Sequence, residues 1–222
     1  MLKEDSKNVT LNRIGYVYFH MEEKPAILFK VLNLYRSNYE ASLHARAIGK
    51  LLNASHMTLL PHLKRLAELK ILNSTTVGRN KQYTLNRQNS LTKYYLTTTE
   101  QLVTLKFLEE SFLMRKFAEH LNSIDIVNPL ILFGSYAKGY ANEESDIDLF
   151  CIGEISESQL AHIKTFENTY GKQTNVKTVS TENFYDGLHT GDILIKEVIK
   201  DHIILCNPDP FVTMLWRNHI ER

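Results

Sequence analysis

The 222-residue sequence predicts an α+β protein with a helical N-terminal domain, a connecting helix and a C-terminal α/β domain with a mixed sheet. Apolar residues recur at helical spacing through the first half, whereas short apolar strands separated by turns occupy the second. Charge divides the chain in the same way. Residues 41–96 contain nine Lys or Arg and one acid, giving +8, and residues 122–222 contain eight and fifteen, giving −7. This asymmetry favours a basic module that meets an anionic partner, beside an acidic one.

The role of residues 1–24 is not readable from the sequence, although the aromatic-rich run at 14–19 is typical of a strand.

Residues 25–96 are expected to form three helices and a hairpin. Ser55 can cap the third helix, and Leu59, Leu63 and Leu66 lie on one face of it. We predict helices over residues 25–36, 43–52 and 55–72, and a basic hairpin over residues 74–86. This order resembles the winged helix-turn-helix domain of small prokaryotic transcription regulators.

The resemblance implies that the third helix enters the major groove of DNA while the hairpin touches phosphates. The candidate DNA contacts are His56, Thr58, His62, Lys64, Arg65, Arg79 and Lys81. Leu60 and Pro61 depart from the pattern of similar regulators, because neither side chain can hydrogen-bond a base. Attraction to phosphates is therefore better supported than sequence readout, and a domain that binds protein instead is the alternative.

Residues 97–121 are predicted to be one long connecting helix, with Thr99 as its cap. Its apolar residues are too many for one narrow stripe, so it should be covered on more than one side. A second copy of the chain can supply that cover, which would give a homodimer suited to a two-fold DNA site.

Two aspartates one residue apart carry the most specific chemical signal. Side chains alternate along a strand, so Asp146 and Asp148 project from one face while Ile147 points the other way. Two adjacent carboxylates repel one another unless a cation compensates them. Oxygen ligands favour Mg²⁺ or Mn²⁺ that takes substrate phosphates as further ligands.

A Gly-Ser turn precedes the aspartates. Residues 130–133 are typical of a buried strand, Gly134 allows a tight turn, and residues 135–138 can open a short helix whose first N–H groups face an anion. Ser135 would donate its hydroxyl to a phosphate oxygen, and Lys138 is a further candidate nucleotide contact.

The whole pattern, Gly-Ser-x-Ala-x-Gly-x5-Ser-Asp-Ile-Asp-Leu, resembles the nucleotidyltransferase superfamily that includes DNA polymerase beta and the minimal nucleotidyltransferases. The resemblance covers residues 122–222. It implies that Gly134 and Ser135 grip phosphate and that Asp146 and Asp148 bind metal. The implied reaction transfers a nucleoside monophosphate from an NTP to a hydroxyl, with two ions clamping the displacement.

A third acidic residue on a neighbouring strand normally completes the site of that family. By position, Asn175 stands there in this chain. An amide can orient a water or ligate weakly, but it cannot accept a proton as a general base. Glu143, Glu144 and Glu182 are alternative bases, although solvated acids at a loop or helix start explain them more simply.

General features fit a cytoplasmic protein. No apolar run approaches a membrane span, the first residues lack a signal-peptide layout, and Cys151 and Cys206 suggest free thiols rather than a disulfide.

Three functional hypotheses remain open from the sequence. The first is an Mg²⁺-dependent nucleotidyltransferase coupled to a DNA-binding domain. The second is a transcriptional regulator that binds nucleotide without catalysis, which Asn175 makes credible. The third is an antitoxin-like interaction protein, because minimal nucleotidyltransferases often pair with a separate toxin partner. A protein, nucleic acid or small molecule can be the acceptor in the first hypothesis.

Overall fold

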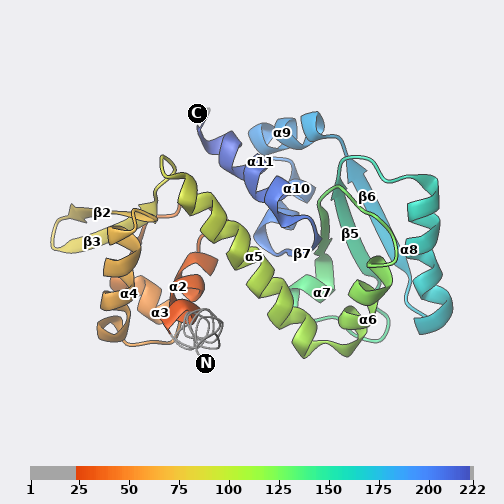
Figure 1. Ribbon diagram of the computed structural model, residues 1–222, viewed down its shortest axis with the longest axis horizontal. Coiled ribbons are helices and arrows are strands. Elements are labelled where there is room, and N and C mark those ends of the chain that lie inside the picture. The colour runs from red at the N-terminus through yellow and green to blue at the C-terminus, as the bar shows by residue number, and fades with distance from the viewer. Residues whose placement is uncertain (1–23, 221–222) are drawn as a thin grey trace, which may run out of the picture.

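The structure is a computed structural model that describes residues 24–220. The strand expected at residues 14–19 lies outside this range. The chain forms a mixed α+β fold with an N-terminal unit and a C-terminal unit joined by a long helix (Figure 1).

The N-terminal unit, residues 24–89, contains three helices and a small sheet. Its elements are α2 (Lys24–Asn33), β1 (Leu43–His44), α3 (Ala45–Leu51), α4 (His56–Glu68), β2 (Leu72–Val77) and β3 (Asn80–Leu85). The strands pair in the order β1-β3-β2, all antiparallel. As expected, Ser55 caps α4 by accepting from the Met57 N–H, and Leu59, Leu63 and Leu66 are buried. Tyr35 adds a hydrogen bond from its hydroxyl to the Tyr83 carbonyl at 2.9 Å.

The connecting region is two helices, so the prediction of one helix over residues 97–121 is wrong. They are α5 (Ser90–Glu110) and α6 (Phe112–Leu121). Ser111 causes the break, because its backbone is extended and its hydroxyl accepts from the Met114 N–H, which caps α6. Thr99 is not a cap either. It is buried within α5, where its hydroxyl donates to the Tyr95 carbonyl.

The C-terminal unit is built around a mixed four-stranded sheet. Its elements are β4 (Leu130–Phe133), α7 (Gly134–Lys138), β5 (Ile147–Ile152), α8 (Glu157–Tyr170), β6 (Thr174–Val179), α9 (Thr181–Thr190), α10 (Ile193–Lys200), β7 (Ile203–Cys206) and α11 (Pro208–Ile220). The strand order is β6-β5-β4-β7, with β5 and β6 parallel and the other pairs antiparallel.

Helices cover both faces of this sheet, which explains why every residue of β4 is buried. Leu149 and Cys151 of β5 face the core formed with α6 and α8. Phe150 and Ile152 face the opposite core, formed with α9, α10 and α11. Figure 1 shows α8 on one side of the sheet and α9 and α10 on the other.

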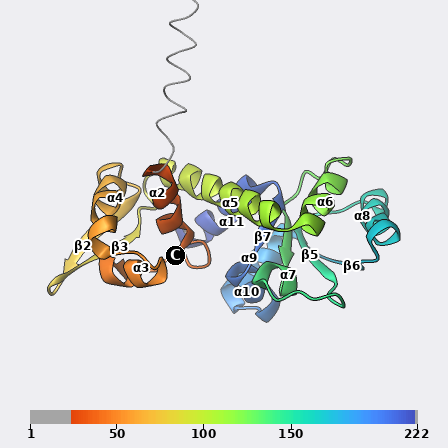
Figure 2. The same ribbon diagram turned by 90° about the horizontal axis from the view of Figure 1, so that it is seen from below.

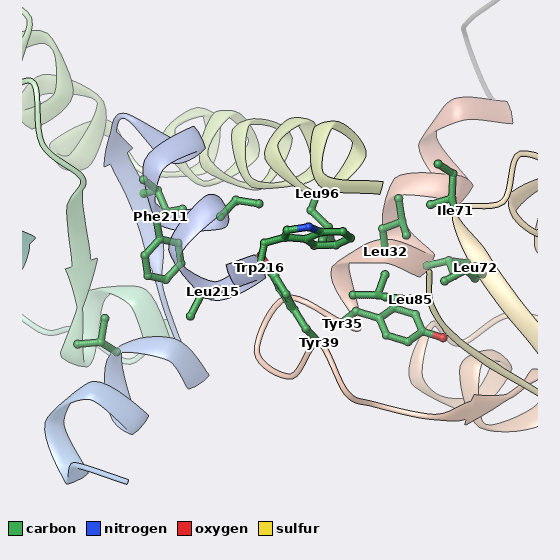
Figure 3. Packing of buried hydrophobic residues seen from close by; sticks show 14 of the residues in the cluster. Leu32, Tyr35, Tyr39, Ile71, Leu72, Leu85, Leu96, Phe211, Leu215 and Trp216 are labelled. Carbon is green, nitrogen blue, oxygen red and sulfur yellow. The ribbon is translucent and has the colours of Figure 1, made fainter. Parts of the chain in front are cut away.

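The two units share one hydrophobic core across α5. Leu96 of α5, Leu32 of α2 and Trp216 of α11 belong to one cluster of buried residues, in which Leu96 lies over the ring of Trp216 (Figure 3). Tyr39 packs edge-on against Trp216 with ring centroids 6.5 Å apart. Trp216 is therefore a packing residue at the boundary between the units.

A buried ion cluster lies at the same boundary. Glu100 of α5 is 1% exposed, and its Oε2 is 2.7 Å from Nε and 2.6 Å from Nη2 of Arg36. His202 Nε2 lies 3.2 Å from the same carboxylate, and Arg36 Nη2 also donates to the His202 carbonyl at 2.9 Å. Burial raises the pKa of Glu100, but the charges and hydrogen bonds of His202 and Arg36 outweigh it and lower that pKa to about 2.

No helix within residues 24–220 is long and apolar enough to cross a membrane. Cys151 and Cys206 are free thiols, and burial raises the pKa of each to about 11.

Glu100→Gln should lower the free energy of unfolding by about 3 kcal/mol, because it leaves the buried guanidinium of Arg36 and the ring of His202 without their carboxylate. The loss should be largest above the ordinary pKa of 4.5 and should shrink as the pH falls towards 2, where the native carboxylate itself takes up a proton. Urea unfolding at several pH values measures both effects. Glu110→Gln is the matched control, because Glu110 makes only an exposed pair with Lys106 on the same helix. Equal stability of the two variants at neutral pH would contradict the prediction.

Candidate functional site

The turn after β4 brings backbone against a carboxylate. Gly134 has a φ of +71°, a conformation that residues with a side chain rarely adopt. A Cβ added there would come within 2.5 Å of Asp148 Oδ2. Only glycine therefore allows the turn to lie so close to Asp148.

The two aspartates lie at the start of β5, on the same face of the sheet. Ile147 between them is buried in the core below, whereas both carboxylates are half-buried. Asp148 stands opposite Phe133 in β4 and opposite Asn175 in β6. The turn and both neighbouring strands therefore meet at Asp148.

Asn175 bridges the two aspartates. Its Nδ2 is 3.3 Å from Asp146 Oδ2 and 3.4 Å from Asp148 Oδ1, so the amide can donate a long hydrogen bond to each. These N–H groups partly compensate two adjacent negative charges. The parallel pairing of β5 and β6 is what brings this residue to the site.

Lys138 forms an ion pair with a residue that sequence reasoning did not identify. Its Nζ lies 2.5 Å from Glu197 Oε1, and this hydrogen bond raises the pKa of Lys138. Glu197 belongs to α10 and lies 59 residues after Lys138 in the chain, and no local motif marks it. Lys138 is thus held beside the site by a partner on another helix.

Three further residues lie around the site. Burial raises the pKa of the Tyr136 phenol, and the nearby negative charge of Asp146 adds to the effect. Lys172 donates to the backbone carbonyls of Asn142 and Glu143, which fastens the loop before Asp146. Ser135 lies half-buried in the first turn of α7, directly after Gly134.

The donor set fits a hard divalent cation, because Mg²⁺ in proteins commonly takes one or two carboxylates and fills its other positions with water or substrate phosphate. Asp146 and Asp148 would supply those carboxylates. Within residues 24–220 no group of three or more His, Cys, Asp or Glu side chains is placed to hold a metal without substrate.

The basic residues expected to meet DNA lie on the N-terminal unit, whereas the aspartates lie on the C-terminal unit. Arg79 and Lys81 are exposed near the tip of the β2–β3 hairpin. On α4, Lys64 and Arg65 are exposed and lie 3.8 and 3.9 Å from Glu68. His56 and Thr58 are exposed on the same helix and His62 is half-buried.

Comparisons with known proteins agree with the geometry of the C-terminal unit. A sequence model of the nucleotidyltransferase domain matches residues 114–206. A protein of Methanocaldococcus jannaschii, named "Putative protein adenylyltransferase", is 31% identical over 114 residues, which cover 49% of this chain and 71% of the relative. No solved structure matches the chain. The chain therefore belongs to the family of proteins that carry a nucleotidyltransferase domain.

Proposed function

We propose that the chain is a metal-dependent nucleotidyltransferase that transfers a nucleoside monophosphate from an NTP to a hydroxyl. The observation that carries the proposal is the close approach of the Gly134 turn to the carboxylate of Asp148, which Asn175 links to the carboxylate of Asp146. Glycine at this position lets the backbone of the turn lie beside carboxylates that suit a divalent cation. Phosphoryl transfer requires this juxtaposition.

Each residue has a role in the proposed reaction. Asp146 and Asp148 would hold Mg²⁺ or Mn²⁺, which would neutralise negative charge on the phosphates. Ser135 donates its hydroxyl to a phosphate oxygen, and Lys138 adds positive charge while Glu197 positions it. The acceptor oxygen forms a bond to the α-phosphorus, the bond from that phosphorus to the bridging oxygen breaks, and pyrophosphate leaves with the electron pair.

With Asn175 in this position, the proton of the acceptor hydroxyl has no carboxylate base there. An amide cannot take the proton, and the Asn175 side chain stands where a third carboxylate would reach both aspartates. This position favours a second candidate function, in which the domain binds nucleotide and regulates without turnover. In the enzyme, the proton passes to water or to substrate phosphate.

The acceptor is proposed from the archaeal relative, whose name describes a protein adenylyltransferase. On that basis ATP is the donor, and a Ser, Thr or Tyr hydroxyl of a protein receives AMP.

We propose further that the N-terminal unit is a winged helix-turn-helix that binds DNA. Three helices followed by an antiparallel hairpin, with exposed Arg79 and Lys81 near its tip, support this. Met57 and Leu60 are also exposed on α4, where they can contact thymine methyl groups but cannot hydrogen-bond base edges. Phosphate contacts therefore supply most of the expected affinity.

A homodimer is the third element of the proposal. Apolar side chains line the outer face of α5 and continue just past its end. They are Leu91, Tyr94, Leu102, Leu105 and Phe112, which are 40–63% exposed. Figure 2 shows α5 running along one edge of the molecule. These side chains expose on the order of 500 Å², so two copies together approach the ~1,000 Å² of a specific interface. The charge split favours an antiparallel pair, because the basic half of one chain then faces the acidic half of the other.

With α-labelled ATP and Mg²⁺ or Mn²⁺, the full chain should transfer label to protein, and Asp146→Asn with Asp148→Asn should reduce transfer at least about a hundredfold. Gel autoradiography measures the transferred label, and equilibrium binding measures the affinity for ATP separately.

Asn175→Asp should raise the transfer rate by about tenfold or more, because a carboxylate can accept the proton. ATP binding without transfer by the natural chain, with transfer gained in Asn175→Asp, would favour the regulator over the enzyme.

Arg79→Ala with Lys81→Ala should weaken binding to a short random-sequence DNA duplex. It should also reduce the slope of log affinity against log salt by about 2, because each lost phosphate contact contributes ~0.9. Fluorescence anisotropy over a salt series measures both. Lys164→Ala, an exposed lysine on α8, is the control. An unchanged slope in the double variant would remove the proposed hairpin contacts.

Sedimentation equilibrium at micromolar concentration should give twice the 25.7 kDa chain mass, and Leu105→Glu should return the mass to one chain, because it places a charge in the apolar face of α5. Leu51→Glu, at an exposed leucine on α3, should leave the dimer intact. A single-chain mass for the natural sequence would exclude this dimer.

A further inference from the structure

The mixed sheet ends at β6 with an open edge that begins at the candidate site. The strand order β6-β5-β4-β7 places β6 at one end of the sheet, and within residues 24–220 its only strand partner is β5 (Figure 1). Asn175, near the start of β6, contacts both aspartates. Asn175, Lys177 and Thr178 are exposed, so solvent reaches side chains on both faces of this strand. The edge is therefore a surface that continues directly from the site.

The backbone of β6 points alternately towards β5 and towards the open edge. The carbonyl of Gln173 accepts from the Ile147 N–H at 2.9 Å, and the carbonyl of Val179 accepts from the Gly153 N–H at 2.8 Å. Backbone groups of successive strand residues point in opposite directions, so the odd-numbered residues of β6 face β5. The groups that point away from the sheet are those of Thr174, Val176 and Thr178. Such a row of donors and acceptors is the template on which an extended polypeptide pairs.

A cavity of about 600 Å³ lies beside β6, on the face of the sheet that carries the aspartates. Phe150, which lines the cavity, lies two positions after the second aspartate of β5 and so shares its face. Val179 of β6 and Leu194 of α10 are half-buried and supply apolar surface, whereas Lys177 and Asp192 are exposed. The cavity can therefore take a large side chain from a strand that lies along β6.

The charge of the C-terminal unit distinguishes between kinds of acceptor. Residues 122–222 contain eight Lys or Arg and fifteen acids, and their net charge of −7 repels the phosphates of a nucleic acid. A polypeptide backbone is neutral, and its side chains can be basic. The charge of the unit and the hydrogen-bonding pattern of the edge thus favour the same acceptor, an extended polypeptide.

We propose that the open edge of β6 binds an extended segment of an acceptor protein as an added strand. This binding mode rests on the proposed transfer of AMP to a protein hydroxyl. Side chains alternate along a strand, so the acceptor residues beside Asn175 and beside Lys177 project onto the face that carries the aspartates. The first presents its hydroxyl towards Asp146 and Asp148, and the second lies over the cavity. An acceptor therefore has a hydroxyl and a large apolar side chain two positions apart in an extended segment.

Transfer of label from α-labelled ATP to short synthetic peptides tests this binding mode on the full chain. The peptides have a fixed central Ser, Thr or Tyr, with either Leu or Gly at both positions two residues away. Peptides with Leu should be labelled about fivefold faster or more, because burial of part of a leucine side chain in the cavity stabilises the complex.

Thr178→Pro should reduce labelling of the peptides at least about tenfold, because proline removes an outward N–H and its ring obstructs the added strand. Thr178→Val is the matched control and should stay within about twofold of the natural chain, because it keeps the outward N–H. Equilibrium binding of ATP should be unchanged in both variants.

Asn183→Trp should abolish the preference for Leu over Gly, because it fills the cavity from an exposed position on α9. His189→Trp, at an exposed position of the same helix that does not line the cavity, should keep the preference.

Peptide labelling that is unchanged in Thr178→Pro would overturn the added strand and leave nucleotidyl transfer standing. Transfer to a single-stranded oligonucleotide but to none of the peptides would have the same meaning. ATP binding without transfer to any of these probes would instead contradict the proposed enzyme, and the binding mode with it. Circular dichroism identifies any failure of Thr178→Pro to fold. In that case Asn183→Trp decides, because it changes an exposed side chain and leaves β6 unaltered.

Discussion

The carboxylate of Glu100 connects three parts of the chain that are far apart in sequence. It lies on α5 and accepts a hydrogen bond from the guanidinium of Arg36 in the N-terminal unit. It also lies within hydrogen-bond distance of the ring of His202, just before β7. A buried charge of this kind is tolerated only when all its partners are in place. The two units must therefore adopt one relative position for the cluster to form, and the shared apolar core depends on that position.

Local patterns predicted most of the fold and the centre of the site. The alternation at Asp146 and Asp148, the strand before Gly134 and the apolar spacing of α4 are all set by residues a few positions apart. Asn175 was placed by counting strands, and the parallel β5–β6 pair brings it to the aspartates. Its chemical role stays a prediction.

What sequence reasoning missed depends on distant contacts or on subtle caps. The pairs Lys138–Glu197 and Arg36–Glu100 join residues 59 and 64 positions apart, and no periodicity reveals them. Ser111 interrupts the connecting helix, although the apolar pattern continues past it. A serine can lie within a helix or cap one, and the backbone of the surrounding fold decides which.

The length of α5 has a consequence for what the molecule can reach. A helix of 21 residues rises by roughly 30 Å, because each residue adds about 1.5 Å. Packing along its length and the Glu100 cluster near its middle fix α5 to both units, so the hairpin and the paired carboxylates keep one separation. The length of α5 therefore sets the distance between the hairpin and the paired carboxylates. A macromolecule held at the hairpin stays at a set distance from the phosphate turn, so an acceptor must extend across that gap or come from another molecule.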